Sequence, residues 1–83
     1  MKGEFMNETI GKVAGRIWQI LAERGEQNIA QIPKILKEET QITYMALGWL
    51  AREGKIDYTT KGSKSCVSLT PAELSIHQQV AVG

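Results

Sequence analysis

Cysteine and histidine are scarce in this chain of 83 residues, and each shortage excludes a class of protein. The single cysteine, Cys66, cannot form a disulfide within the chain, which excludes a small disulfide-stabilised fold and predicts a reducing, cytoplasmic location. The single histidine, His77, belongs to no cysteine and histidine cluster with the spacing of a metal site. We therefore expect no metal and no cofactor.

Signatures of enzymes are also missing. No glycine-rich loop follows a predicted strand and opens a helix, as a phosphate-binding loop does. Glu38 and Glu39 are adjacent acids in a predicted turn, and His77 has no nucleophile or carboxylate paired with it in a recognisable pattern. We interpret all three as solvated or structural, and we expect neither enzymatic activity nor a small-molecule substrate.

Excess charge of one sign and long apolar runs are lacking as well. The formal net charge of +1 provides no bulk attraction to nucleic acid or to an acidic membrane surface. The apolar runs are too short to cross a bilayer, and the first residues lack the apolar segment of a signal peptide. These short runs predict no membrane association. The length predicts one domain with a modest core.

The stretch from Thr40 to Ile56 determines the predicted architecture. Thr40 is a suitable helix cap, and Gly54 is a suitable helix end because glycine enters the left-handed conformation without a Cβ clash. Four residues at helical spacing form an inward stripe: Thr43, Ala46, Leu47 and Leu50. A helix, a glycine and an alternating run together are typical of the junction between the third helix and the wing of a winged helix-turn-helix.

Two further helices are predicted before this stretch. The first spans residues 7–25 and has an apolar stripe at helical spacing. Gly11 and Gly15 lie inside this helix, so we expect a neighbouring backbone or bulky side chain to pack at these glycines. The second spans residues 28–37 by the spacing of a capping box. Pro33 predicts that it begins later than this box or has an irregular first turn, and residues 37–39 are the turn before the third helix.

The residues after Gly54 predict a hairpin and a last helix. Ile56, Tyr58 and Thr60 alternate as in a half-buried strand, residues 61–64 form a turn, and residues 65–69 alternate again. In the second strand we expect Val67 and Leu69 to face inward and Cys66 to face the other side. Thr70, Pro71 and Glu73 have the pattern of a helix start, with Glu73 completing a capping box and the helix ending near Gln79.

These elements predict an α+β fold: a winged helix-turn-helix with a three-helix core and a β-hairpin wing, followed by a short C-terminal helix. We divide the chain into a flexible N-terminal extension (1–6), the winged helix-turn-helix domain (7–69), and a short helix and tail (70–83).

Two motifs resemble a small prokaryotic winged helix-turn-helix family that is catalogued as a domain of unknown function. The first motif is Ala14-Gly15-Arg16-Ile17-Trp18, and the second runs from Ala46 through Glu53 and continues with Lys55-Ile56. The match covers roughly residues 8–69, and the second motif is fairly specific. The resemblance implies a winged-helix fold and supplies no activity and no catalytic residues.

Two functions remain open. By analogy of fold, the first is a non-enzymatic module that binds double-stranded DNA in transcription regulation. Its candidate contacts are Gln41, Arg52, Lys55, Lys61 and Lys64. Glu38 and Glu39 argue against it, because they precede the third helix and would repel phosphate.

The alternative is a protein-interaction or homodimerisation module that uses the apolar face of the third helix. Its candidate contacts are Ile42, Tyr44, Met45, Gly48 and Trp49. Large apolar side chains on a small monomer need a cover, and this cover is either a partner or the segment 70–80 folded back on the helix.

Overall fold

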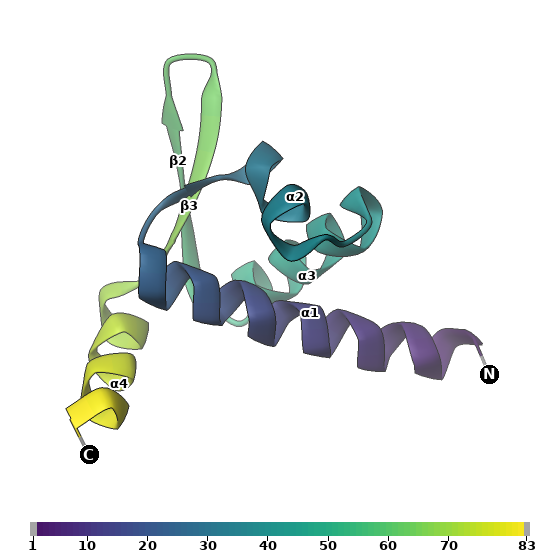
Figure 1. The fold of residues 1–83 in the computed structure, drawn as a ribbon, viewed down its shortest axis with the longest axis horizontal. Coiled ribbons are helices and arrows are strands. Elements are labelled where there is room, and N and C mark those ends of the chain that lie inside the picture. Colours follow the sequence, from purple (N-terminus) through teal and green to yellow (C-terminus); the bar gives the residue numbers. More distant parts are fainter. Residues whose placement is uncertain (1, 83) are drawn as a thin grey trace.

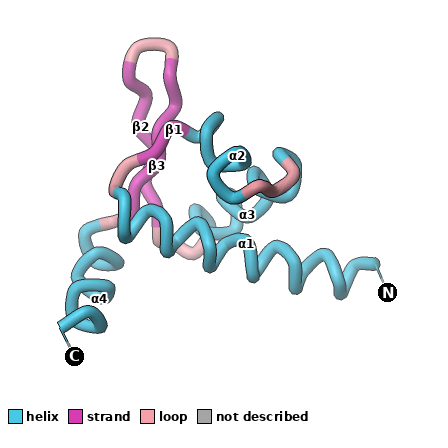
Figure 2. The backbone as a smooth tube through the Cα atoms, in the orientation of Figure 1, coloured by secondary structure: helices cyan, strands magenta, loops and turns pink. Residues whose placement is uncertain are grey.

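The computed structural model describes the backbone of residues 2–82 and the side chains of residues 7–77. In this part of the chain, helices pack beside a small antiparallel sheet whose outer hairpin projects away from them (Figures 1 and 2). The elements are α1 (Lys2–Arg24), β1 (Gln27–Asn28), a 3-10 turn η1 (Ile29–Gln31), α2 (Ile32–Leu36), α3 (Thr40–Arg52), β2 (Ile56–Lys61), β3 (Lys64–Leu69) and α4 (Pro71–Val82). The predicted winged helix-turn-helix is confirmed.

The core lies between α1, α3 and the sheet. Both predicted stripes are buried: Ile10, Val13, Ala14, Ile17 and Leu21 on α1, and Thr43, Ala46, Leu47 and Leu50 on α3. Thr43 is the buried polar residue of this core, and its hydroxyl donates a hydrogen bond of 2.8 Å to the carbonyl oxygen of Glu39. Burial therefore leaves no unpaired hydroxyl at this position.

Helix α1 begins at Lys2, earlier than the expected start near Asn7, so residues 2–6 continue the helix where an extension was predicted. No proline lies between Lys2 and Asn7 to stop the helix, and Asn7 is an interior helical residue instead of a cap. The helix ends as predicted before Gly25, which has a φ of 80°.

The segment around Pro33 combines both predicted irregularities. The Asn28 carboxamide accepts a hydrogen bond from the backbone N–H of Ala30 and caps the 3-10 turn. Helix α2 then begins at Ile32, which places Pro33 in its first turn, where a proline is tolerated. Lys37 adopts the left-handed conformation (φ 56°) and starts the predicted turn.

The two ends of α3 differ in how well they were predicted. Glu39, not Thr40, is the N-cap, and its side chain makes no capping hydrogen bond. The backbone N–H of Glu39 donates a hydrogen bond of 3.0 Å to the Glu38 carboxylate, and the expected capping bond to the Thr40 hydroxyl is not formed. At the other end, Gly54 adopts a φ of 72° and directs the chain into β2, as predicted.

The sheet has the order β1-β3-β2, with both pairs antiparallel. Lys61 pairs with Lys64 across the turn, and Gly62 in this turn has a φ of 63°. The half-buried pattern expected for β2 is wrong beyond Ile56: Tyr58 and Thr60 are exposed. Figure 1 shows that the outer part of the hairpin projects past the helices.

Helix α4 begins as predicted, but Glu73 does not complete the predicted capping box. The Thr70 hydroxyl accepts a hydrogen bond from the Glu73 backbone N–H at 3.4 Å. The backbone N–H of Thr70, which a capping box would offer to the Glu73 carboxylate, donates instead to the carbonyl oxygen of Lys55. The helix runs to Val82, beyond the expected end near Gln79; the side chain of Val80 lies outside the described residues.

The expectation that something packs closely at Gly11 and Gly15 is wrong. Both glycines are exposed, and a Cβ built on either has no contact within 4 Å. The interior of α1 therefore has two open positions at which glycine weakens the helix without a packing gain.

Replacing Gly11 or Gly15 by alanine should stabilise the protein by about 1 kcal/mol each, because alanine has the higher helix propensity and finds free space. Gly54→Ala is the control with the opposite expected sign. A Cβ at Gly54 also has free space, but alanine in this left-handed backbone conformation should lower the stability by about 1 kcal/mol or more. Urea unfolding of the three variants gives the comparison. A loss of stability in both α1 variants would show that these positions are packed after all.

Candidate nucleic-acid interface and a pocket between two tryptophans

The outward face of α3 carries most of the residues singled out in the sequence. Gln41 lies in its first turn and Arg52 at its end, and both are exposed. Between them are three large apolar side chains that are substantially exposed: Tyr44 (46%), Met45 (39%) and Trp49 (44%). Gly48 is also exposed, so the face is apolar at its centre and polar at its ends.

Ile42 lies at the edge of this face. It is half-buried and packs partly against the core. Helix α4 does not provide the cover that the sequence left open, since Tyr44 and Met45 stay exposed. Trp49 shares a pocket with Ile76 of α4 but also stays exposed.

The two lysines of the hairpin differ in their surroundings. The Lys61 ammonium lies 2.6 Å from a carboxylate oxygen of Glu26, and this hydrogen bond and charge raise the pKa of Lys61 above its usual value. For Lys64, on the other side of the turn, no ion pair is found among the described side chains. Lys64 is thus better placed than Lys61 to receive an external anion.

A shallow groove joins the hairpin to α3. It is lined by Asn28, Ile29, Ala30, Tyr44, Ser63, Lys64 and Ser65. The exposed face of α3 contributes Tyr44, and the hairpin contributes Lys64 with two hydroxyl groups. The structure therefore brings Lys64 and the α3 face to one continuous surface.

Lys55 lies away from the tip of the hairpin, near the place where α3 ends. Its backbone is fixed by two hydrogen bonds, one donated to Leu50 and one accepted from Thr70. Its ammonium lies 3.6 Å from a carboxylate oxygen of Glu53. The structure thus separates Lys55 from Lys61 and Lys64, with which the sequence analysis had grouped it.

Arg16 is a residue that the sequence analysis did not single out. Its guanidinium donates a hydrogen bond of 2.6 Å to the carbonyl oxygen of Leu36 and lies 3.7 Å from the Glu38 carboxylate. This contact ties α1 to the end of α2 and partly neutralises Glu38. The repulsion of phosphate expected from Glu38 is reduced accordingly, whereas Glu39 has no such partner among the described side chains.

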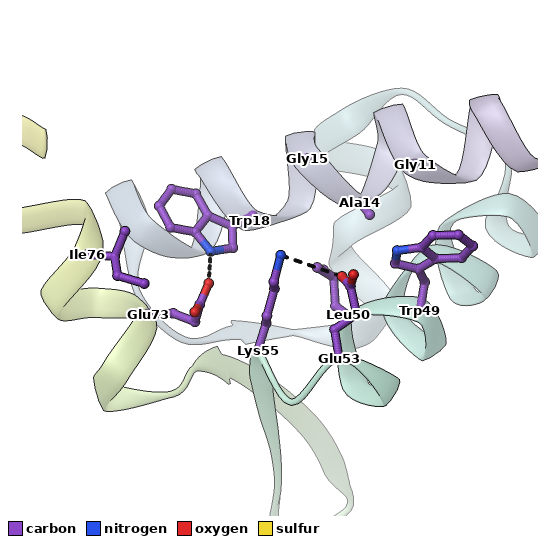
Figure 3. Close-up of a pocket in the computed structure, with 10 residues that line it drawn as sticks. All are labelled: Gly11, Ala14, Gly15, Trp18, Trp49, Leu50, Glu53, Lys55, Glu73 and Ile76. Carbon is purple, nitrogen blue, oxygen red and sulfur yellow. Dashed lines mark hydrogen bonds and ion pairs between the residues drawn. The ribbon is translucent and has the colours of Figure 1, made fainter.

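Figure 3 shows a second pocket, of about 620 Å³, between the indoles of Trp18 and Trp49. The Trp18 indole N–H donates to the Glu73 carboxylate at 2.8 Å, and the His77 ring meets the Trp18 ring edge-on at 5.7 Å. The sequence showed Trp18 only as part of the α1 stripe. No pattern indicated its contact with Glu73, because the two residues are far apart in the chain.

Two kinds of structural feature are absent from the part of the chain that is described. No helix there is long and apolar enough to cross a membrane. No group of three or more histidine, cysteine, aspartate or glutamate residues there is arranged to hold a metal ion.

Comparison with known proteins gives one family and one curated relative. Residues 5–69 match the family model described as "Winged helix-turn-helix domain (DUF2582)". An uncharacterized protein of Methanocaldococcus jannaschii, MJ1608, is 48% identical over 61 residues, which is 70% of this chain and 84% of that protein.

Solved structures with the same fold include a mutant of Lactococcus lactis ZitR in its apo form. It has a TM-score of 0.75 and 22% identity over 96% of this chain and 64% of its own. A MarR family regulator from Neisseria meningitidis, NMB1585, has a TM-score of 0.71 and 18% identity over 83% of this chain and 51% of its own. This chain thus spans less than two thirds of both proteins, and the likeness concerns the fold. By the match of its residues 5–69, this chain belongs to the winged helix-turn-helix family DUF2582.

Proposed function

We propose that this protein binds double-stranded DNA as a regulator-like winged helix-turn-helix module. The observation that carries the proposal is the continuous surface formed by the outward face of α3 and the hairpin, joined at the groove that Tyr44 and Lys64 share. A helix face beside a projecting hairpin fits a duplex, with the helix in the major groove and the hairpin along the backbone. The regulator from Neisseria meningitidis with this fold supports the proposal by analogy.

The residues on this surface have separate roles in the proposal. Lys64 and the neighbouring hydroxyl groups of Ser63 and Ser65 contact phosphate. Gln41 and Arg52 are the side chains of α3 that can hydrogen-bond to base edges or to the backbone. Tyr44 and Met45 supply apolar contacts, for which thymine methyl groups are suitable partners. Few cations take part, so the affinity is modest and its dependence on salt is shallow.

The experiment that tests this proposal is a fluorescence anisotropy titration of a labelled mixed-sequence duplex at several salt concentrations. We expect a Kd on the order of 1–100 µM at low salt. The logarithm of the association constant should fall by about 0.9 for each phosphate contact when the salt concentration rises tenfold. Absence of binding at low salt would refute the proposal. Binding that is independent of salt would exclude the assigned role of Lys64.

Replacing Glu26 by glutamine should tighten DNA binding about twofold to threefold, because it releases Lys61 from its ion pair and leaves that ammonium available for phosphate. The same titration measures the effect. Glu23→Gln is the matched control, since it removes one negative charge from an exposed residue of α1 that has no contact with Lys61. An equal gain in both variants would mean that net charge alone is responsible.

A second candidate function is association with a protein through the same face of α3. The exposure of Tyr44, Met45 and Trp49 favours it, because interface cores are rich in aromatic residues and methionine. Sedimentation velocity over a range of concentrations tests self-association through this face. If Met45→Lys dissociates an oligomer and leaves DNA binding intact, the two functions use separate residues.

A further inference from the structure

The pocket between Trp18 and Trp49 has two indoles and charged side chains in its lining, and it shares Trp49 with the face of α3 that is proposed to contact DNA. Its walls come from elements distant in sequence: Trp18 from α1, Trp49 from α3 with Glu53 directly after that helix, and Glu73 from α4. It is an open depression of about 620 Å³. Gly11 and Gly15 of α1 form its floor and place no side chain in it.

The charges around this pocket favour a cation. The lining contains two carboxylates, Glu53 and Glu73, against one ammonium, that of Lys55. The carboxylate of Glu73 is held in position by the indole N–H of Trp18 at 2.8 Å. Indole faces also attract cations through the negative potential of the ring.

The chain's own ammonium already occupies the middle of this pocket. In Figure 3 the Lys55 side chain lies between Trp18 and Trp49 and points toward α1. Its ammonium is 3.6 Å from Glu53, at the long end of ion-pair distances, and its side chain is 40% exposed. A side chain held so loosely can rotate into solvent and give up its position to another cation.

We propose that this pocket binds a small organic cation, an ammonium group on an aromatic or aliphatic body, which displaces the ammonium of Lys55 from Glu53. The ammonium of the ligand lies near Glu53 and Glu73, and its apolar body lies between the two indoles above the glycine floor. An organic anion is disfavoured, because it would meet two carboxylates for each lysine.

Tryptophan fluorescence gives a direct test, because the chain has two tryptophans and both line the pocket. The probe is phenethylamine, and 3-phenylpropionate is the control with a similar body and the opposite charge. We expect saturable quenching or a spectral shift with phenethylamine and none with 3-phenylpropionate. No DNA is present, so the outcome does not depend on the proposed DNA binding.

Variants then determine whether the charges act as proposed. Lys55→Met removes the internal competitor and should tighten phenethylamine binding about fivefold, whereas Glu73→Gln should weaken it about fivefold and still accept the Trp18 hydrogen bond. Glu39→Gln removes the same charge outside the pocket and should leave the affinity unchanged. All variants are first compared with the parent protein by circular dichroism and urea unfolding.

Three results would overturn the proposal. Tighter binding of 3-phenylpropionate, lost in Lys55→Met, would make the pocket an anion site. No saturable signal with either probe would mean that the pocket takes neither ligand class. A change in sedimentation coefficient that accompanies the fluorescence change in proportion would assign the signal to association of copies at Trp49.

Discussion

DNA binding by the double variant Arg52→Glu and Lys64→Glu is expected to be weaker than that of the parent protein by at least about tenfold at low salt. Arg52 lies at the end of the α3 face, and Lys64 lines the groove between this face and the hairpin. Both side chains are exposed, so their reversal changes the surface charge without disturbing the core. Anisotropy titration with the same duplex measures the loss, and the salt dependence of log K should also become shallower.

The control for this variant reverses two cations elsewhere. Lys12 and Arg24 are exposed residues of α1, and their replacement by glutamate changes the net charge by the same amount. We expect this control to bind much more tightly than the first double variant. Equal losses in the two would indicate bulk electrostatics instead of a defined surface, and full binding by the first variant would remove both residues from the interface.

Replacing Ile17 by alanine should lower the free energy of unfolding by about 2–5 kcal/mol. Ile17 is fully buried on α1, in the centre of the core that α1 forms with α3 and the sheet. For a domain of this length such a loss is a large part of the total, which is about 4–12 kcal/mol. Urea unfolding followed by circular dichroism measures the change as a shift of the midpoint.

A graded series separates cavity formation from other effects. Ile17→Val removes one methylene and should cost about 0.5–1.5 kcal/mol. Lys12→Ala, on the exposed side of the same helix, should stay within about 0.5 kcal/mol of the parent protein. A loss for Ile17→Ala no larger than that for Lys12→Ala would show that α1 does not pack as the structure describes.

The sequence predicted those parts of the fold that depend on local rules. The helical stripes of α1 and α3 are buried because apolar residues recur at the helical period. Gly54 and Gly62 adopt left-handed backbones at the two turns that define the hairpin. In both cases a few neighbouring residues contain all the necessary information.

The parts that were not predicted depend on contacts between distant segments. Alternation in β2 suggested a buried side, but Tyr58 is exposed. Glycines inside α1 suggested a close neighbour, yet Gly15 is open. In each case the residue type was compatible with packing, and only the placement of the other elements decides whether a neighbour is present.

The candidate site shows the same division. The position of Tyr44, Met45 and Trp49 on the side of α3 away from the core follows from the phase of the α3 stripe, whereas their exposure, with no cover from α4, could not be predicted. The pairing of Lys61 with Glu26 could not, because it requires the register of β1 beside β3. The contact between Trp18 and Glu73 likewise requires the direction in which α4 leaves the sheet.

The central position of β3 has a consequence for how the protein opens and closes. Asn28 of β1 pairs with Cys66 of β3, and this residue pair closes a long chain loop that contains α2, α3 and β2. Closing a long loop costs chain entropy, which the local hairpin of β2 and β3 largely avoids. Hydrogen exchange should therefore find the amides shared by β1 and β3 exchanging only when the whole domain opens. The amides near Gly62, where the hairpin projects alone, should exchange by local fraying.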